Sequence, residues 1–282
     1  METVFLGKSE LKVTRIGLGC WQFGTPGWGW GQTLDEKDAL RIIHAALDSG
    51  INWVDTAEVY GDGISEEIIG KALKGKRDKV IIATKVSGNH LKKMDVKKAI
   101  EGSLKRLQTD YVDLYQVHWH NPYVALSETM EALKEVVREG KARYIGVSNF
   151  SRTLTQEARK YFRPGELISN QVRYNLLRRE IEQEILPYNR KVGMSTIAYS
   201  PLAQSLLTGK FKSYEQVPSD IRKENPLFSS RENFQKALQV VETVEKIARE
   251  HQVTPAQVAL KWVIEQKGVV AIPGAKSVEQ AQ

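Results

Sequence analysis

The chain has 282 residues, of which 41% are hydrophobic and 27% are charged, and these proportions are typical of a folded globular protein rather than a disordered one. It has no apolar run near the roughly 20 residues of a membrane helix, no N-terminus built like a signal peptide, and only one cysteine, Cys20, which excludes an intrachain disulfide. The net charge of +7 comes from basic residues that alternate with acidic ones along predicted helices, which favours a small anionic ligand over nucleic acid. We therefore expect a cytoplasmic protein without nucleic-acid or membrane partners, present as a monomer or weak homo-oligomer.

The chain begins with a predicted β-hairpin. Two short strands around a polar turn are expected within Leu6–Ile16, followed by a further strand over Ile16–Cys20. A hairpin ahead of a repeating pattern is a candidate plug for the floor of a barrel. The Gly-rich run Thr25–Gln32 then predicts a loop, in which Trp28 and Trp30 either border a substrate site or cover core surface.

From Leu34 onward, strands and helices alternate. Apolar residues at three- and four-residue steps predict helices, and apolar runs bounded by turn residues predict strands. After the strand over Ile16–Cys20, the predicted strands are Asn52–Asp55, Val80–Lys85, Tyr111–His118, Tyr144–Ser148, Leu167–Gln171, Ser195–Tyr199 and Val269–Ile272. The predicted helices include one near Asp35–Ser49, one that starts at a Ser65 cap, and three with Ile100, Met130 and Leu238 on their apolar faces.

Eight alternations in about this length predict an α/β fold, a (β/α)8 TIM barrel with an N-terminal β-hairpin and a long loop after strand seven, from Ser200 to about Glu232. A doubly wound sheet is disfavoured because Gly17 and Gly19 lie within a strand and do not open a helix. We expect a single TIM-barrel domain over residues 1–282. The final barrel helix is expected to be missing from these residues, which end where it would begin; alternatively, the barrel closes in another way.

Four side chains would meet at the C-terminal end of such a barrel. Asp55, Lys85 and His118 end three successive strands, and Tyr60 lies on the turn after Asp55. A tyrosine hydroxyl has a pKa of about 10 and is a poor acid at neutral pH unless a cation favours its anion. Lys85 would supply that cation, and Asp55 would hold its ammonium. Each residue alone has an ordinary structural explanation, such as a cap, a loop or a solvated lysine, but their joint placement predicts an active site.

Two later stretches are candidate phosphate sites. Ser200–Lys210 opens the long loop with hydroxyls, a glycine and a lysine that suit a pyrophosphate, although this pattern alone is weakly specific. Lys276 and Ser277 follow the last strand, at the start of a predicted helix. The five histidines lack paired metal-ligand spacing, so no metal site is predicted.

Several stretches occur in a characteristic order: Asp55-Thr-Ala-Glu-Val-Tyr60-Gly, Ser65-Glu66, Lys85, His118, Gly146-Val-Ser-Asn-Phe150, Asn170-Gln171, Tyr199-Ser-Pro-Leu202 and Ile272-Pro-Gly-Ala-Lys276. Together they resemble the aldo-keto reductase superfamily, over essentially the whole chain. The Trp28-Gly-Trp-Gly31 loop and the Leu206–Lys210 run are most similar to its bacterial general-stress and inositol-operon reductase branch. Ser205 departs from that branch, which commonly has glycine there.

The resemblance implies NADPH-dependent, reversible reduction of aldehyde and ketone carbonyls in a small-molecule substrate. Tyr60 would donate the proton while a nicotinamide gives its hydride; Lys85, held by Asp55, would lower the pKa of the phenol, and His118 would orient the carbonyl. The implied cofactor-binding residues are Trp21, Ser148, Asn149, Gln171, Tyr199, Ser200, Leu202, Ser205, Lys210, Gly274, Lys276, Ser277 and Gln280, and the implied substrate-binding residues are Trp28, Trp30 and Trp119. Lys276 matches the residue that binds a 2′-phosphate, which favours NADPH over NADH.

Two alternatives stay open. A nicotinamide-binding redox-sensing or regulatory subunit with slow turnover would keep the same four residues, since similar barrels serve as partners of ion channels. A metal-dependent hydrolase on the same barrel would need clustered histidine and carboxylate ligands, which the lone His118 disfavours.

Overall fold

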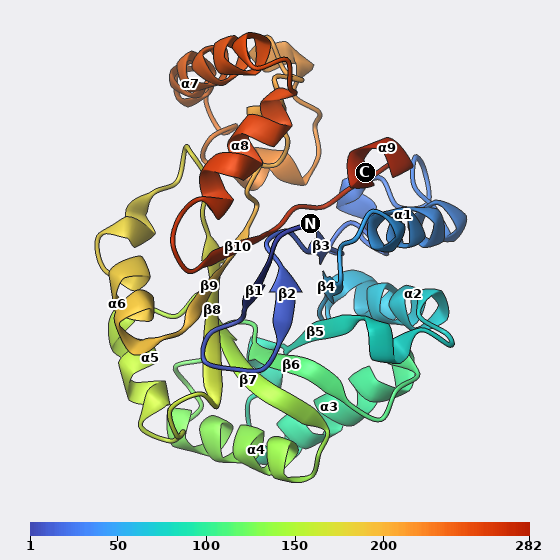
Figure 1. Cartoon of the computed structure of the whole chain (residues 1–282), viewed down its shortest axis with the longest axis vertical. Coiled ribbons are helices and arrows are strands. Elements are labelled where there is room, and N and C mark those ends of the chain that lie inside the picture. The colour runs from blue at the N-terminus through green and yellow to red at the C-terminus, as the bar shows by residue number, and fades with distance from the viewer.

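A computed structural model describes residues 1–282 and contains one eight-stranded parallel barrel surrounded by helices (Figure 1). In sheet order the strands are β3 (Leu18–Gly19), β4 (Trp53–Asp55), β5 (Ile81–Val86), β6 (Val112–Val117), β7 (Ala142–Ser148), β8 (Leu167–Arg173), β9 (Ser195–Tyr199) and β10 (Val269–Ile272). The first and last strands meet through backbone hydrogen bonds from Gly17 N to Ala271 O (2.8 Å) and from Gly19 N to Pro273 O (2.9 Å). The predicted (β/α)8 TIM barrel is therefore confirmed.

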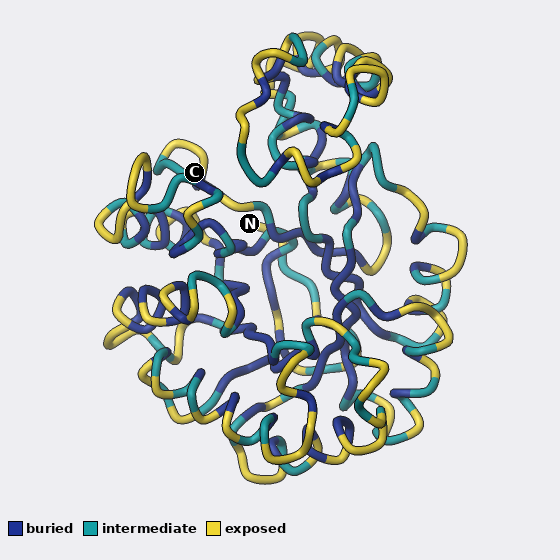
Figure 2. Tube along the Cα trace, turned by 180° about the vertical axis from the view of Figure 1, so that it is seen from behind, coloured by how far each residue is buried: buried dark blue, intermediate teal, exposed yellow.

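The helices are α1 (Glu36–Asp48), α2 (Ile64–Ala72), α3 (Lys93–Leu107), α4 (Leu126–Arg138), α5 (Arg152–Arg159), α6 (Ile185–Val192), α7 (Arg231–Glu250), α8 (Pro255–Ile264) and α9 (Val278–Ala281). Most of them pack their apolar stripes against the outside of the barrel, whereas α7 packs against α8 and the segment after β9, away from the strands. Figure 2 shows the barrel strands largely buried and the exposed residues on the outer faces of the helices and in the loops, as expected for amphipathic helices. None of the helices combines the length and apolar character needed to span a membrane.

The hairpin of β1 (Thr3–Phe5) and β2 (Lys12–Thr14) closes one end of the barrel. Leu6, Leu11 and Val13 are buried in one cluster with residues that point into the barrel, including Trp53. The expected plug is thus present, but its first strand lies before Leu6 rather than after it. Gly7 ends that strand because its φ of +61° is left-handed and its N–H donates to Ser195 Oγ at 2.7 Å. The opposite end, at the carboxyl ends of the barrel strands, is not closed by the hairpin, and the predicted active site lies there.

The start of α2 differs from the prediction. Its N-cap is Gly63, at φ 95°, and not Ser65, which lies inside the helix and is fully buried. The Ser65 hydroxyl instead donates to Cys20 O (2.9 Å) and accepts from Thr56 Oγ1 (2.9 Å), so it joins the turn after β4 to the end of β3. A side chain at position 63 would collide with Arg106, since its Cβ would lie 2.5 Å from that residue's Cδ.

Other differences lie at element ends and in the second half of the chain. β6 ends at Val117, one residue before His118. The sequence does not predict α5, which has few apolar residues, or α6, which contains Pro187. The long excursion after β9 is more ordered than a loop, with 3₁₀ turns at Leu206–Thr208, Tyr214–Gln216 and Ile221–Glu224 around an apolar cluster of its own.

Candidate active site

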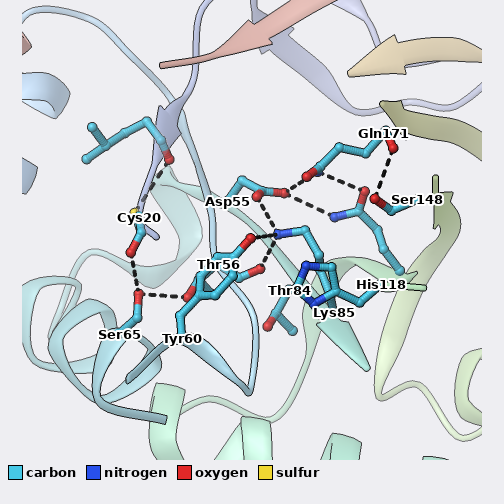
Figure 3. A network of polar contacts seen from close by, with 12 residues as sticks. Cys20, Asp55, Thr56, Tyr60, Ser65, Thr84, Lys85, His118, Ser148 and Gln171 are labelled. Atoms are coloured by element: carbon cyan, nitrogen blue, oxygen red, sulfur yellow. Dashed lines mark hydrogen bonds and ion pairs between the residues drawn. The ribbon is translucent and has the colours of Figure 1, made fainter. Parts of the chain in front are cut away.

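The four predicted catalytic side chains come together at the C-terminal end of the barrel (Figure 3). Asp55 is the last residue of β4, Lys85 lies near the end of β5, and His118 directly follows β6. Tyr60 opens the 3₁₀ turn Tyr60–Gly63 that leads into α2. Parallel strands bring their carboxyl ends to one edge, which is why residues 63 positions apart in the chain become neighbours.

A buried ion pair forms the base of this cluster. Lys85 Nζ lies 2.6 Å from Asp55 Oδ1, and the two side chains are 0% and 2% exposed. The ammonium also donates to Thr56 O (2.7 Å) and to the Tyr60 hydroxyl (3.2 Å), so its three N–H groups are all used. Burial is the largest single effect and alone would lower the pKa of Lys85, but the charges and hydrogen bonds of Asp55 and Tyr60 together outweigh it, and the pKa is raised. Lys85 is therefore a fixed cation beside the phenol.

Two glutamine amides complete the partners of Asp55. Gln116 Nε2 and Gln171 Nε2 donate to Asp55 Oδ2 at 3.1 and 2.8 Å. Gln171 is among the site residues predicted from the sequence, whereas Gln116 is not. Gln116 lies on β6, two residues before His118, which directly follows that strand, and the two-residue period of the strand, continued by one residue, places both on the same face. The two-residue spacing from His118 would therefore have been enough to predict Gln116 as a residue of the site.

The pKa of Tyr60 differs from the expected lowering. Burial raises it, and this effect exceeds the lowering by Lys85, so the net pKa of the phenol lies above its ordinary value. Asp55 also raises it, because its negative charge disfavours a second anion nearby. The hydroxyl is consequently protonated at neutral pH, and Lys85 acts mainly by stabilising negative charge when the proton leaves.

His118 is neutral in this environment. Burial, followed by the positive charge of Lys85, lowers the pKa of its imidazole to about 3. The ring contacts the edge of Tyr60, with 5.6 Å between ring centroids. A neutral imidazole carries one N–H and can donate it to an oxygen next to the Tyr60 hydroxyl.

The residues expected to bind a nicotinamide ring form one hydrogen-bonded group beside the cluster. Ser148 Oγ donates to Gln171 O (2.9 Å), Asn149 Nδ2 donates to Ser148 Oγ (3.0 Å), and the Tyr199 hydroxyl donates to Asn149 Oδ1 (3.0 Å). Asn149 Nδ2 also donates to His118 O at 3.2 Å, which joins this group to the catalytic cluster. These four hydrogen bonds connect the residues to one another and to His118.

The stretch after β9 has an unusual backbone. Ser200, Ala203, Gln204 and Ser205 have φ values of 50°, 48°, 55° and 76°, all in the left-handed region. Non-glycine residues rarely adopt this region, and where they do, the segment is often a ligand clamp. Leu202 is half-buried in this segment, and Lys210 at its end is exposed.

Lys276 lies where an anion can reach it. It forms no ion pair; its Nζ donates to Trp28 O at 2.6 Å and lies 5.1 Å from the Trp28 ring. The guanidinium of Arg222 lies 4.9 Å from the same ring. Burial, and then the charge of Arg222, lower the pKa of Lys276. Arg222 is not among the predicted site residues, because it lies in the long excursion after β9, whose sequence has no periodic pattern.

The other residues predicted near the last strand, Gly274, Ser277 and Gln280, make contacts that stabilise the turn after β10. Ser277 caps α9 by accepting from Gln280 N (3.3 Å), and Gln280 Oε1 accepts from Lys276 N (2.9 Å). Gly274 is exposed, and a Cβ there would lie 2.8 Å from Gln22 Oε1. These contacts fix the turn that carries Lys276.

The tryptophans expected in a substrate pocket separate into three environments. Trp119 is 52% exposed and stacks beside His118, with 6.4 Å between centroids. Trp30 packs against the main core, which agrees with the interpretation that it covers core surface. Trp28 is buried next to Lys276 and Arg222. Trp21, expected at the cofactor, lies between Trp28 (5.2 Å) and Tyr60 (6.3 Å).

Comparisons with known proteins agree with this geometry. Residues 15–282 match the profile of the Aldo/keto reductase family. The aldo-keto reductase YhdN of Bacillus subtilis is 40% identical, over 100% of this chain and 87% of that protein, and the NADH-specific methylglyoxal reductase of Escherichia coli is 33% identical, over 100% and 92%. The crystal structure of an aldo-keto reductase from Klebsiella pneumoniae in complex with NADPH has a TM-score of 0.78 at 35% identity, covering 99% of this chain and 87% of that one.

Proposed function

Because this chain belongs to the aldo/keto reductase family and is an oxidoreductase acting on carbonyl groups, we propose that it reduces aldehydes and ketones with NADPH and that Tyr60 is the proton donor. The observation that carries this proposal is the contact of a buried, permanently charged lysine with a protonated tyrosine hydroxyl, 3.2 Å apart. Such a pair is suited to giving up a proton and stabilising the anion left behind.

The proposed mechanism assigns one task to each residue. The Tyr60 hydroxyl gives its proton to the carbonyl oxygen, and Lys85 Nζ stabilises the phenolate as it forms. His118 donates its single N–H to the same oxygen and orients it. A reduced nicotinamide, when bound, would supply the hydride for the carbonyl carbon, and this hydride with the proton from Tyr60 would give the alcohol.

The residues also fit a nicotinamide dinucleotide. Gln171 Nε2 is already used by Asp55, but its Oε1 is free to accept from a carboxamide, and the Tyr199 ring, held by its hydroxyl on Asn149, would be the stacking surface for the nicotinamide. Lys276 and Arg222 suit a 2′-phosphate, because Lys276 has no carboxylate partner in the folded chain. These two cations favour NADPH as the cofactor, although the relative from Escherichia coli is named as NADH-specific.

The proposed cofactor preference predicts a difference between the two dinucleotides. In fluorescence titrations, NADPH should bind more tightly than NADH, and Lys276→Met should raise the Kd of NADPH by about 10–100-fold, as loss of a charged hydrogen bond implies, without changing the Kd of NADH. Lys261→Met, which removes an exposed lysine on α8, is the matched control. Equal Kd values for both dinucleotides in the unmodified protein would refute the preference.

Turnover of an aldehyde by the unmodified protein tests the proposed reductase activity. With an aromatic aldehyde, loss of reduced nicotinamide absorbance should be rapid relative to NADPH exchange. Tight binding of NADPH without turnover of any aldehyde or ketone would instead favour a redox-sensing subunit.

The pKa shifts predict the pH dependence of reduction. Tyr60 must keep its proton to act as an acid, and its raised pKa means that activity falls only as pH rises through a value above about 10. His118, with a pKa of about 3, stays neutral over the whole range above that value. At saturating NADPH, kcat should therefore be flat from about pH 5 to pH 9. An inflection near the ordinary histidine pKa, removed by His118→Gln, would contradict a neutral His118.

A further inference from the structure

Trp28 holds the two cations that the proposed cofactor needs. Its backbone carbonyl accepts from Lys276 Nζ at 2.6 Å, and its ring lies 5.1 Å from that nitrogen and 4.9 Å from the Arg222 guanidinium. The residue is only 7% exposed, yet its indole Nε1 has no hydrogen-bond partner. A buried donor left without a partner is costly, so this N–H reduces the free energy that the free protein gains from placing Trp28 here.

The charges around Trp28 are unbalanced. Arg222 is paired with Asp220, whereas Lys276 has only the carbonyl and the ring of Trp28 as partners. Lys210 is close enough to lower the pKa of Lys276 further. One carboxylate therefore faces three cations, and a phosphate dianion would supply the missing charge far better than a neutral carbonyl and a ring face.

The Trp28 segment also contacts both neighbouring parts of the site. On one side Gly27 packs against the excursion after β9, since a Cβ there would lie 3.3 Å from Ile221 Cβ. On the other side Trp28 contacts Trp21 edge to face, and Trp21 lies 6.3 Å from Tyr60. Trp28 is therefore linked through Trp21 to the side of Tyr60.

We propose that Trp28 is a specificity-determining residue for the cofactor and acts by competition. In the free protein it occupies Lys276 and Arg222, and a 2′-phosphate must take these cations from it. A dinucleotide without that phosphate cannot do so and leaves Trp28 in place. The inference rests on the proposed function, in which the cofactor's 2′-phosphate binds these two residues.

Binding of small phosphate probes tests the competition without any turnover. By isothermal titration calorimetry, Trp28→Ala should bind adenosine 2′,5′-bisphosphate about tenfold more tightly than the unmodified protein, the change expected from removing two competing cation–π contacts. Its affinity for adenosine 5′-monophosphate should not change. Trp28→Phe preserves packing and should shift the same affinity in the same direction by a smaller factor. Weaker or unchanged binding of the bisphosphate by both variants would overturn the proposal.

Tryptophan emission gives a second readout. The bisphosphate should shift the emission of the unmodified protein to the red and increase quenching by acrylamide, and Trp28→Phe should abolish both changes. Trp262→Phe is the matched control, because Trp262 also lies under an arginine, 5.2 Å from Arg179, but on α8. An emission change that persists in Trp28→Phe would refute the proposal.

The outcomes also separate this inference from the proposed function. If the unmodified protein binds neither NADPH nor the bisphosphate, the proposed function fails as well. If NADPH binds and aldehydes are reduced while the Trp28 variants behave as wild type, only this inference fails.

Discussion

Tyr60→Phe is expected to lower kcat for aldehyde reduction by about 10²–10⁴-fold and to leave the Kd of NADPH unchanged, because a positioned general acid contributes about that much. The substitution keeps the ring, and with it the contacts to Trp21 and His118. It deletes only the hydroxyl that lies 3.2 Å from Lys85 Nζ. Steady-state turnover with a fixed aldehyde, together with a cofactor titration, measures the two effects separately.

The matched control for Tyr60→Phe is Tyr123→Phe, which removes a hydroxyl from a side chain that is 95% exposed. It should retain full turnover. Retention of more than about a tenth of kcat by Tyr60→Phe would mean that another group supplies the proton, since the loss would then be smaller than general acid catalysis accounts for. Water or His118 would be the next candidate.

The barrel and the catalytic cluster could be predicted because they depend on local pattern and one geometric rule. Asp55, Lys85 and His118 each follow an apolar run, and parallel strands bring such positions to one end of a barrel. Two features limited the prediction. Arg222 reaches the site through 3₁₀ turns that no periodic pattern announces, and Ser65 looks like a cap but lies inside α2, because Gly63 alone fits the left-handed turn before it.

The sign of the Tyr60 pKa shift could not be obtained from sequence at all. A lysine beside a phenol implies a lowered pKa, and Lys85 does act in that direction. Burial acts in the opposite direction and is the larger effect, and the degree of burial follows only from the packed structure. The same applies to Trp28, whose environment depends on two segments that lie about 190 and 250 residues further along the chain.

The second large effect is expected at the buried ion pair, where Lys85→Met should reduce the free energy of unfolding by about 3–5 kcal/mol. The variant leaves the Asp55 carboxylate buried with only the amides of Gln116 and Gln171 as partners. Removing one partner of a buried pair is costly because the remaining charge is neither solvated nor compensated. Denaturant unfolding measures this loss, and Lys71→Met, at the exposed pair with Glu36, should leave the midpoint nearly unchanged.

A double variant separates the stabilising role of the pair from its role in catalysis. Asp55→Asn combined with Lys85→Met removes both charges, so most of the lost stability should return, whereas kcat should stay as low as in Lys85→Met alone. The free energy of unfolding recovers in the double variant because folding requires only that no buried charge be left unpaired. The value of kcat does not recover, because proton transfer from Tyr60 requires the ammonium itself, 3.2 Å from the hydroxyl. Recovery of turnover along with stability in the double variant would show that Lys85 supports the fold and takes no part in the chemistry.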